Sequence, residues 1–480
     1  MTDVTHYDIA LIGSGSANSF PGPEFAGRSI VQIDRGVGPD HVFGGTCLNL
    51  GCIPTKMFVH TANLAHTPAE SARFGVTEQL RHVDWPAIRD RIFGRIDPIT
   101  AGGEQYRAEH EDNANLTLLR GTARFLDRRT LQVSGHDGSE RTISADTIVL
   151  GAGSRPVLPE IDGLAEARPH TSDTIMRIAQ LPASLAILGS GVIAVEMAHI
   201  FASLGVEVTL IARSAQLLRA ADADVSARLT EILGDRLRLE TELSTTSVRR
   251  TGEGIELRGL RDGAEVTVQA EELLVAVGRR PNSDLLDVAA AGIDTAEDGR
   301  VRVDEHQRVL GAGEVLEGLW AFGDLSSAEQ LKHVANHEQR VLGHNLLHPE
   351  NLQPFHHAHV PYAVFTWPQI ASVGLTEDEA RAAGHDITVK TQDYGDVAYG
   401  WAMEDSVGCC KLIADRSTGL LLGAHIMGAQ APSLIQILIQ GIEFGLTVPD
   451  MARRQYWIHP ALAEVVENAL LGLDFPDRGF

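Results

Sequence analysis

Two apolar segments of this chain, 7–12 and 185–188, each run directly into a glycine-rich turn. A strand that ends in such a turn and leads into a helix directs backbone N–H groups towards a pyrophosphate. Two copies in one chain of 480 residues predict two dinucleotide-binding units with an α/β fold. The length of the chain is typical of about three domains.

The first glycine-rich turn departs from the usual pattern. Gly13 and Gly15 follow the strand, but Asn18 stands where a third glycine is expected. Pro21 and Pro23 follow closely. Because proline is excluded from helix interiors, the helix after this turn must be short or displaced.

The next predicted strand, 30–34, ends in Asp34, about twenty residues beyond the turn. An acid at this place is suited to bind the two hydroxyl groups of a ribose. Strand, turn, strand and acid in this order predict the first dinucleotide site. A purely structural glycine loop is the alternative.

The second unit matches the pattern more closely, with Gly189, Gly191 and Ala194 in the three small-residue positions. The strand that follows, 206–211, leads not to an acid but to Arg213, with Arg219 six residues later. A carboxylate there would repel the 2′-phosphate of NADP, whereas two guanidinium groups would bind it. We therefore expect a preference for NADPH over NADH; two solvated arginines are the alternative.

The segment 44–56 carries two cysteines, Cys47 and Cys52. Residues five apart in a regular helix are separated by ~8–9 Å, and a disulfide tolerates at most about 7 Å between Cα atoms. The helix must therefore be broken or wound tightly between them, and Gly51 supplies the freedom to do so. Pro54 is typical of the first turn of a helix, which places Cys52 near an N-terminus that favours a thiolate. The segment predicts a redox-active disulfide; two buried structural cysteines are the alternative.

Composition limits the compartment and the partners. The chain has only 4 cysteines and a formal net charge of −24, so it is neither a disulfide-stapled secreted scaffold nor a basic nucleic-acid-binding protein. No export signal is visible at the N-terminus, and no apolar run approaches the ~18 residues of a membrane span. We expect a cytoplasmic protein without nucleic-acid or membrane partners.

No metal site is expected. Cys409 and Cys410 are adjacent, so on a strand they would point to opposite faces, and we interpret them as packing residues. The run of histidines at 356–359 suggests a metal site, but a solvated loop before the last domain is the better interpretation.

Two dinucleotide sites and a redox cysteine pair suggest that electrons pass from nicotinamide to flavin to disulfide. Asp324 lies where a strand end would meet the ribityl chain of the flavin. Lys332 would begin a helix whose dipole stabilises negative charge on the reduced flavin. Lys56 and Glu196 are expected to pair beside the flavin; a surface pair is the alternative.

With these motifs in order, the whole chain resembles the flavoprotein disulfide reductases, the group that includes glutathione reductase and dihydrolipoamide dehydrogenase. Departures from the family pattern are Asn18 with its neighbouring prolines, and Gly-Ala-Gly at 151–153 where relatives often have Ala-Thr-Gly. Within the family, the resemblance is closest to the members that reduce mycothione. Three segments carry that likeness: 172–179, 393–405 and 455–468.

The resemblance implies an architecture of two Rossmann-like domains and a C-terminal α+β dimerisation domain. The FAD-binding domain would occupy 1–160, the NADPH-binding domain 161–282, and a central part that returns to the FAD domain 283–351. The dimerisation domain would occupy 352–480. Family members are typically homodimers in which the partner's C-terminal domain completes each active site.

The resemblance also implies roles for individual residues. Cys52 would face the flavin, and Cys47 would attack the substrate disulfide. His459 would act as acid and base, with Glu464 holding its imidazole, both contributed to the partner's site. The implied cofactors are FAD and NADPH, and the implied cofactor-binding set is Gly13, Gly15, Asp34, Thr46, Lys56, Ala123, Asp324, Lys332, Gly189, Gly191, Ala194, Glu196, Arg213, Arg219 and Gly278.

The leading hypothesis is an NADPH-dependent, FAD-containing reductase of mycothione. This disulfide carries sugar and inositol groups and lacks the free carboxylates of glutathione, so its pocket should need few cationic anchors. Tyr456 and Trp457 could pack on such a ligand or in the core. The alternatives are a dihydrolipoamide dehydrogenase or another small-disulfide reductase, a metal-binding module built on the two cysteines, and a flavin electron-transfer protein without a disulfide substrate.

Overall fold

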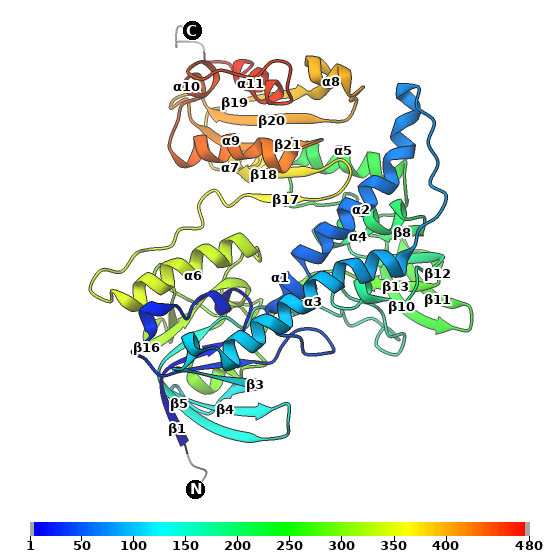
Figure 1. The fold of residues 1–480 in the computed structure, drawn as a ribbon. Coiled ribbons are helices and arrows are strands. Elements are labelled where there is room, and N and C mark those ends of the chain that lie inside the picture. The colour runs from blue at the N-terminus through cyan, green and yellow to red at the C-terminus, as the bar shows by residue number, and fades with distance from the viewer. Residues whose placement is uncertain (1–3, 476–480) are drawn as a thin grey trace.

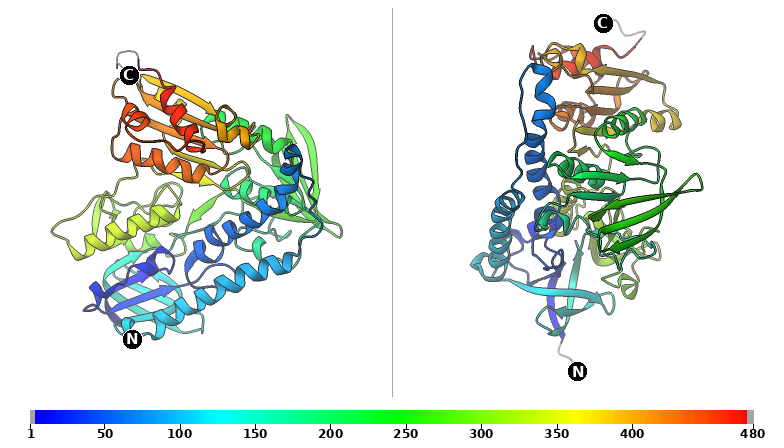
Figure 2. Two further views of the ribbon diagram at one scale, coloured as in Figure 1. Left: turned by 45° about the horizontal axis from the view of Figure 1, so that its top comes forward. Right: turned by 90° about the vertical axis from the view of Figure 1, so that its right-hand side faces the viewer.

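A computed structural model describes residues 4–475. Five β-sheets and their helices make up the described residues (Figure 1), and we group them into N-terminal, central and C-terminal domains. The N-terminal domain includes a second stretch of chain, residues 308–347, that follows the central domain in sequence. The strand β1 lies at the end of the molecule opposite the C-terminal domain (Figures 1 and 2).

The N-terminal domain is built on a seven-stranded sheet in the order β1-β2-β3-β4-β5-β16-β15, with β1 also pairing with β5. The pairs β1–β2, β2–β3, β1–β5 and β5–β16 are parallel, as a dinucleotide fold requires, and β4 links β3 to β5 by antiparallel pairing. The strands are β1 (Val4–Ile12), β2 (Ile30–Asp34), β3 (Leu116–Phe125), β4 (Thr130–Gly135), β5 (Glu140–Leu150), β15 (Arg308–Gly311) and β16 (Glu314–Ala321).

The central domain has a parallel four-stranded sheet in the order β13-β7-β8-β9 and an antiparallel sheet in the order β10-β11-β12. Helices α4 (Val192–Ser203) and α5 (Ala223–Gly234) belong to it. A short antiparallel ribbon, β6 (Ser154–Pro156) with β14 (Arg279–Pro281), pairs the two connections to the N-terminal domain. The other strands are β7 (Ser184–Leu188), β8 (Glu207–Ile211), β9 (Arg238–Glu240), β10 (Ser244–Thr251), β11 (Gly254–Arg261), β12 (Ala264–Ala270) and β13 (Glu272–Val275).

The C-terminal domain is an antiparallel five-stranded sheet in the order β17-β18-β21-β20-β19, with helices beside it. Its strands are β17 (Tyr362–Val364), β18 (Ile370–Gly374), β19 (Ile387–Asp393), β20 (Cys409–Asp415) and β21 (Leu421–Met427). Its helices are α7 (Glu377–Ala382), α8 (Ala398–Ala402), α9 (Ala431–Glu443), α10 (Val448–Arg453) and α11 (Ala463–Leu471). The expected α/β class with an α+β C-terminal domain is therefore confirmed.

Four helices of the N-terminal domain position the candidate site: α1 (Gly45–Asn49), α2 (Cys52–Ser71), α3 (Trp85–Glu109) and α6 (Lys332–Leu347). Helix α2 packs against α3 and also against α4 of the central domain. Phe58 of α2 and Trp85 of α3 stack with ring centroids 5.0 Å apart inside this contact. Helix α2, which begins at Cys52, is thereby packed directly against the central domain.

The helical structure after the first glycine turn is short, as expected. Between β1 and β2 the described chain forms only two short 3₁₀ helices, Ser16–Ser19 and Pro23–Phe25. Pro23 begins the second of them, at a position that needs no N–H donor. Among residues 4–475, no helix is long and apolar enough to cross a lipid bilayer.

Candidate active site

The two cysteines lie at a break between α1 and α2. Helix α1 ends at Asn49, and α2 begins at Cys52, so Leu50 and Gly51 interrupt the helical path as expected. A Cβ added to Gly51 would lie 3.1 Å from the carbonyl oxygen of Thr46, which leaves little room for a side chain at the break. Cys47 and Cys52 are free thiols in direct hydrogen-bond contact. The pair is therefore close enough for thiol–disulfide chemistry.

The two thiols differ in acidity. The hydrogen bond from Cys47 lowers the pKa of Cys52 to about 7, with further help from the backbone N–H of Cys52 and the charge of Lys56. The same hydrogen bond, together with burial and the Cys52 charge, raises the pKa of Cys47. Cys52 is thus the thiolate of the pair near neutral pH, as its place at a helix N-terminus predicts.

Helix α1 lies directly against the first glycine-rich turn. A Cβ added to Gly45 would lie 2.4 Å from the Cα of Gly15, so only glycine permits this approach. The Ser14 hydroxyl accepts a hydrogen bond of 2.7 Å from the Gly44 N–H. Asn49 fixes the other side of α1 by donating 2.7 Å to the Phe43 carbonyl. The cysteine pair is therefore placed beside a dinucleotide-type turn.

The first dinucleotide site fits an adenosine ribose. Asp34 ends β2 and is 5% exposed, and its Oδ2 has no hydrogen-bond partner within residues 4–475. Burial raises the pKa of Asp34, and Arg120, 3.9 Å from Oδ2, opposes that effect. A buried acceptor without a donor suits the hydroxyl groups of a bound ribose. Gly13 packs closely against Gly151, because a Cβ added to Gly13 would lie 2.4 Å from the Gly151 carbonyl oxygen.

Arg107 of α3 replaces the missing helix as the support of this turn. Its Nε donates 3.0 Å to the Asn18 Oδ1, and its other nitrogens donate to the carbonyl oxygens of Asn18 and Pro21. Gln32 of β2 donates 3.0 Å to the carbonyl of Gly13. Asn18 is therefore a structural substitute for the third glycine. The role of Arg107 could not be predicted from the sequence, because no local pattern links it to a turn 89 residues away.

Two further expected flavin residues, Asp324 and Lys332, come from the second stretch of the N-terminal domain. Asp324 follows β16, and its Oδ2 accepts 2.6 Å from the Ser154 hydroxyl. Lys332 is the first residue of α6, as predicted, and its Nζ donates 2.8 Å to the Ser16 hydroxyl beside the first turn. Thr46 is a half-buried residue of α1, and Ala123 is a buried core residue of β3.

The expected ion pair between Lys56 and Glu196 is present at 2.6 Å. It joins α2 to α4, and Glu196 also accepts 2.9 Å from the Phe365 N–H. The Lys56 ammonium lies 4.0 Å from the centroid of the Phe365 ring. The pair is not an exposed surface contact, because Glu196 is buried. Phe365 was not predicted, since it lies in the C-terminal domain, far along the chain.

The second glycine turn leads from β7 into α4. Gly189 has a positive φ of 142°, and its Cβ would lie 2.2 Å from the Ala276 carbonyl oxygen. Gly191 precedes α4 and Ala194 is fully buried in its first turn. Gly278, also at positive φ, lies in the connection back to the N-terminal domain.

Arg213 and Arg219 lie exposed in the segment after β8. Within residues 4–475, neither guanidinium makes an ion pair or hydrogen bond. The segment is held beside the turn, since the Leu218 N–H donates 2.9 Å to the Ser190 carbonyl. Two free cations next to a dinucleotide turn fit a 2′-phosphate.

His459 and Glu464 form the expected pair, with Nδ1 2.6 Å from Oε1. His459 is 70% exposed, whereas Glu464 is mostly buried and also accepts 3.2 Å from the Ala461 N–H. The imidazole therefore presents Nε2 outward. Helix α11, which carries Glu464, lies at the end of the molecule away from α1 (Figure 1). The chain's own histidine and cysteine pair are not brought together.

The structure shows the surroundings of the other residues for which the sequence allowed more than one interpretation. Trp457 donates 3.0 Å to the Ala452 carbonyl and packs on the C-terminal core, whereas Tyr456 is fully exposed. Cys409 and Cys410 lie in β20 and belong to different core clusters, so they are packing residues on opposite faces, as predicted. The histidines 356–359 lie in an exposed loop.

Comparison with known proteins identifies the family. The model of the pyridine nucleotide-disulphide oxidoreductases matches residues 7–339, and the model of their dimerisation domain matches residues 360–470. The chain belongs to the pyridine nucleotide-disulphide oxidoreductases. As a member, the enzyme is an FAD-containing oxidoreductase that uses a pyridine nucleotide. The metal-binding-module hypothesis is therefore wrong.

Several relatives of this oxidoreductase match along nearly the whole chain. A mycothione reductase of Mycobacterium tuberculosis is 51% identical over 475 residues, covering 97% of this chain and 99% of the relative. A mercuric reductase of Streptomyces lividans is 34% identical, covering 95% and 94% of the two chains. A dihydrolipoyl dehydrogenase of Halobacterium salinarum is 32% identical, covering 97% and 96%. The solved copper(II) complex of the HOCl-induced flavoprotein disulfide reductase RclA from Escherichia coli superposes with a TM-score of 0.82, at 25% identity, over 98% of this chain and 99% of that chain.

Proposed function

We propose that this enzyme is an NADPH-dependent reductase of mycothione that returns the disulfide to two molecules of mycothiol. The observation that carries the proposal is the 51% identity to a mycothione reductase along almost the entire length of both chains. The relatives named as mercuric reductase and dihydrolipoyl dehydrogenase are less similar, at 34% and 32% identity. The thiol pair beside the first glycine turn supplies the chemistry that a disulfide reductase needs.

FAD would be held by the first glycine-rich turn and Asp34, and it would supply the transfer of two electrons from NADPH to the Cys47–Cys52 disulfide. The reduced pair then has two roles. Cys47 attacks one sulfur of the substrate disulfide, forming a mixed disulfide and releasing the first thiol. Cys52 attacks the Cys47 sulfur, which releases the second thiol and restores the internal disulfide. In sum, NADPH, one proton and one disulfide give NADP⁺ and two thiols.

His459 is suited to the proton transfers of this sequence. An imidazole can accept a proton from Cys47 and then donate it to the leaving thiolate. Cys47 needs such a base, because its hydrogen bond to Cys52 and its burial raise its own pKa. Glu464 holds Nδ1 at 2.6 Å, which leaves Nε2 for the reacting sulfur.

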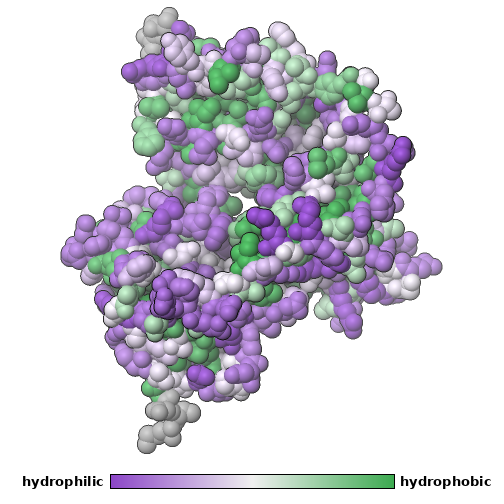
Figure 3. Space-filling view, viewed as in Figure 1, coloured by the Kyte–Doolittle hydropathy of each residue, from purple (hydrophilic) through white to green (hydrophobic). Residues whose placement is uncertain are grey.

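We propose a homodimer in which His459 serves the partner's cysteine pair. The match to a dimerisation domain over residues 360–470 supports an assembly through the C-terminal domain. That domain exposes large apolar side chains around His459, among them Tyr456 and Ile458, and apolar groups are visible on its surface (Figure 3). Such exposure is typical of an interface. We place the activity in the reducing cytoplasm, where a dithiol pair is maintained.

NADPH oxidation by the FAD-loaded enzyme tests the proposal. Mycothione, glutathione disulfide and lipoamide are supplied in parallel at equal concentration. We expect rapid turnover with mycothione alone. Turnover with lipoamide and a preference for NADH would instead support the dihydrolipoamide dehydrogenase alternative and contradict the assignment of Arg213 and Arg219. If all three disulfides are inert while NADPH still bleaches the flavin colour, the substrate assignment is wrong.

A further inference from the structure

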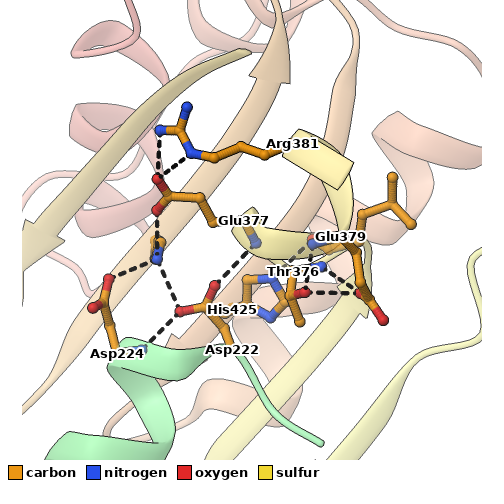
Figure 4. A network of polar contacts seen from close by, with 9 residues as sticks. Asp222, Asp224, Thr376, Glu377, Glu379, Arg381 and His425 are labelled. Atoms are coloured by element: carbon orange, nitrogen blue, oxygen red, sulfur yellow. Dashed lines mark hydrogen bonds and ion pairs between the residues drawn. The ribbon is translucent and has the colours of Figure 1, made fainter. Parts of the chain in front are cut away.

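A buried lysine joins the central domain to the C-terminal domain, away from the cysteine pair. Lys411 of β20 is 3% exposed. Its Nζ lies 2.9 Å from Asp222, 2.6 Å from Asp224 and 2.8 Å from Glu377. The two aspartates come from the start of α5, whereas Glu377 begins α7 (Figure 4). One ammonium therefore ties two domains together at a single point.

Asp222 is the central member of this cluster. It is 1% exposed and caps α5, with Oδ1 accepting 3.1 Å from the Asp224 N–H. Its Oδ2 accepts 3.2 Å from the Glu377 N–H, so the carboxylate bonds to both domains (Figure 4). Bonds from Lys411 and from the Glu377 N–H favour the charged form and lower the pKa of Asp222 against its burial.

Asp222 directly follows the segment 212–221, which carries Arg213 and Arg219. The middle of that segment is bonded to the second glycine turn through Leu218, whose N–H donates 2.9 Å to Ser190. The Ala221 N–H closes the last turn at 2.7 Å on the Leu218 carbonyl. The segment is therefore fixed at the coenzyme turn through Leu218 and at the lysine through Asp222, with Arg219 between these two points and Arg213 before them.

Net stability alone is a weak explanation for such a cluster. A buried ion pair must offset the desolvation of both charges, and an apolar replacement of the whole pair is often as stable. Here one lysine with Arg381, 2.6 Å from Glu377, faces three carboxylates. The cluster instead fixes the position of the segment 212–221 relative to the C-terminal domain.

We propose that Lys411 is a positioning residue that, through Asp222, holds Arg219 at the distance from Arg213 required by the 2′-phosphate of NADPH. Discrimination between NADPH and NADH then depends on a contact outside the coenzyme site, the bond between Lys411 of the C-terminal domain and Asp222 of the central domain. The inference rests on the proposed NADPH preference and adds a determinant that does not touch the coenzyme.

Calorimetric binding of 2′,5′-ADP and 5′-AMP to the FAD-loaded enzyme tests the inference without turnover. The quantity of interest is the ratio of the two dissociation constants. We compare the wild type with Lys411→Met and with the double variant Lys411→Met/Asp222→Asn. The double variant leaves no buried charge unpaired, and asparagine remains a good helix cap, so it is expected to fold. Arg228→Gln is the matched control, because Arg228 pairs at 3.0 Å with Asp393 between the same α5 and the same C-terminal domain.

We expect the preference for 2′,5′-ADP to fall about tenfold or more in both lysine variants, with little change for 5′-AMP. Arg228→Gln should keep the wild-type ratio. An unchanged ratio in the folded double variant, or an equal loss of affinity for both ligands, would overturn the inference while leaving the proposed function intact. A wild type without any preference for 2′,5′-ADP would overturn the proposed coenzyme, and the inference with it.

Discussion

At the scale of single residues, the two thiols of one pair are made chemically different by their surroundings. Cys52 begins α2, and Lys56, one turn along that helix, lowers the pKa of its thiol, whereas Glu196 raises it. Because Lys56 and Glu196 are themselves paired at 2.6 Å, their effects on Cys52 partly cancel. The acidity of the thiol is therefore adjustable in both directions by neighbouring substitutions.

The substitution Lys56→Met should raise the pKa of Cys52, by about one unit, because it removes a nearby positive charge. Glu196→Gln should lower it. The ultraviolet absorbance of the thiolate as a function of pH, in a Cys47→Ser background, measures both. Shifts in the same direction in the two variants would show that general disturbance of the site, and not charge, controls Cys52.

At the scale of elements, the local signals in the sequence were sufficient for the parts that bind nucleotides. The end of β2 at Asp34 and the start of α6 at Lys332 could be predicted, because strand periodicity and end residues are signals within one segment. The supporting contacts could not be predicted in this way. Arg107, Phe365 and Lys411 act on residues 89, 169 and 189 positions away, and each looks like an ordinary residue in its own segment.

Helix α6 is also connected to the exposed histidine loop. Glu338 is buried, accepts 2.6 Å from the Gly323 N–H beside Asp324, and pairs at 2.8 Å with His357. The bond to Glu338 and the nearby Glu329 raise the pKa of His357, against burial and the charge of Arg300. The loop therefore contributes an ion pair to the turn that carries a proposed flavin residue.

Since the folded pKa of His357 is raised, its stabilising effect is complete below the unfolded value of about 6.5 and is lost as pH rises through the folded pKa. His357→Gln should therefore lower the thermal midpoint most in acidic buffer. The difference from wild type should shrink towards alkaline pH. A difference that stays constant between about pH 5.5 and about pH 9 would contradict a role for the imidazolium.

At the scale of the whole molecule, the groups to which we assign the chemistry lie in two different domains. The cysteine pair lies beside the N-terminal sheet, and His459 is exposed on the C-terminal domain. The α/β class could be predicted from the motifs, but the relative position of these two groups could not. In the proposed homodimer, this position depends on how the domains pack and on a second copy of the chain.

Sharing of sites predicts complementation between inactive variants. Cys47→Ser and His459→Gln homodimers should each be inactive. After denaturation and joint refolding, half of the dimers are mixed, and each has one intact site of two, so about a quarter of the wild-type activity should return. No recovery, with mixed dimers present by mass spectrometry, would mean that His459 serves its own chain.

The central claim is that electrons from NADPH leave the enzyme through Cys47. The most direct test compares mycothione turnover and NADPH-dependent bleaching of the flavin colour in the wild type and in Cys47→Ser. We predict that Cys47→Ser loses turnover by a factor on the order of 10³ or more, with bleaching retained. Continued turnover of mycothione in this variant would contradict the account.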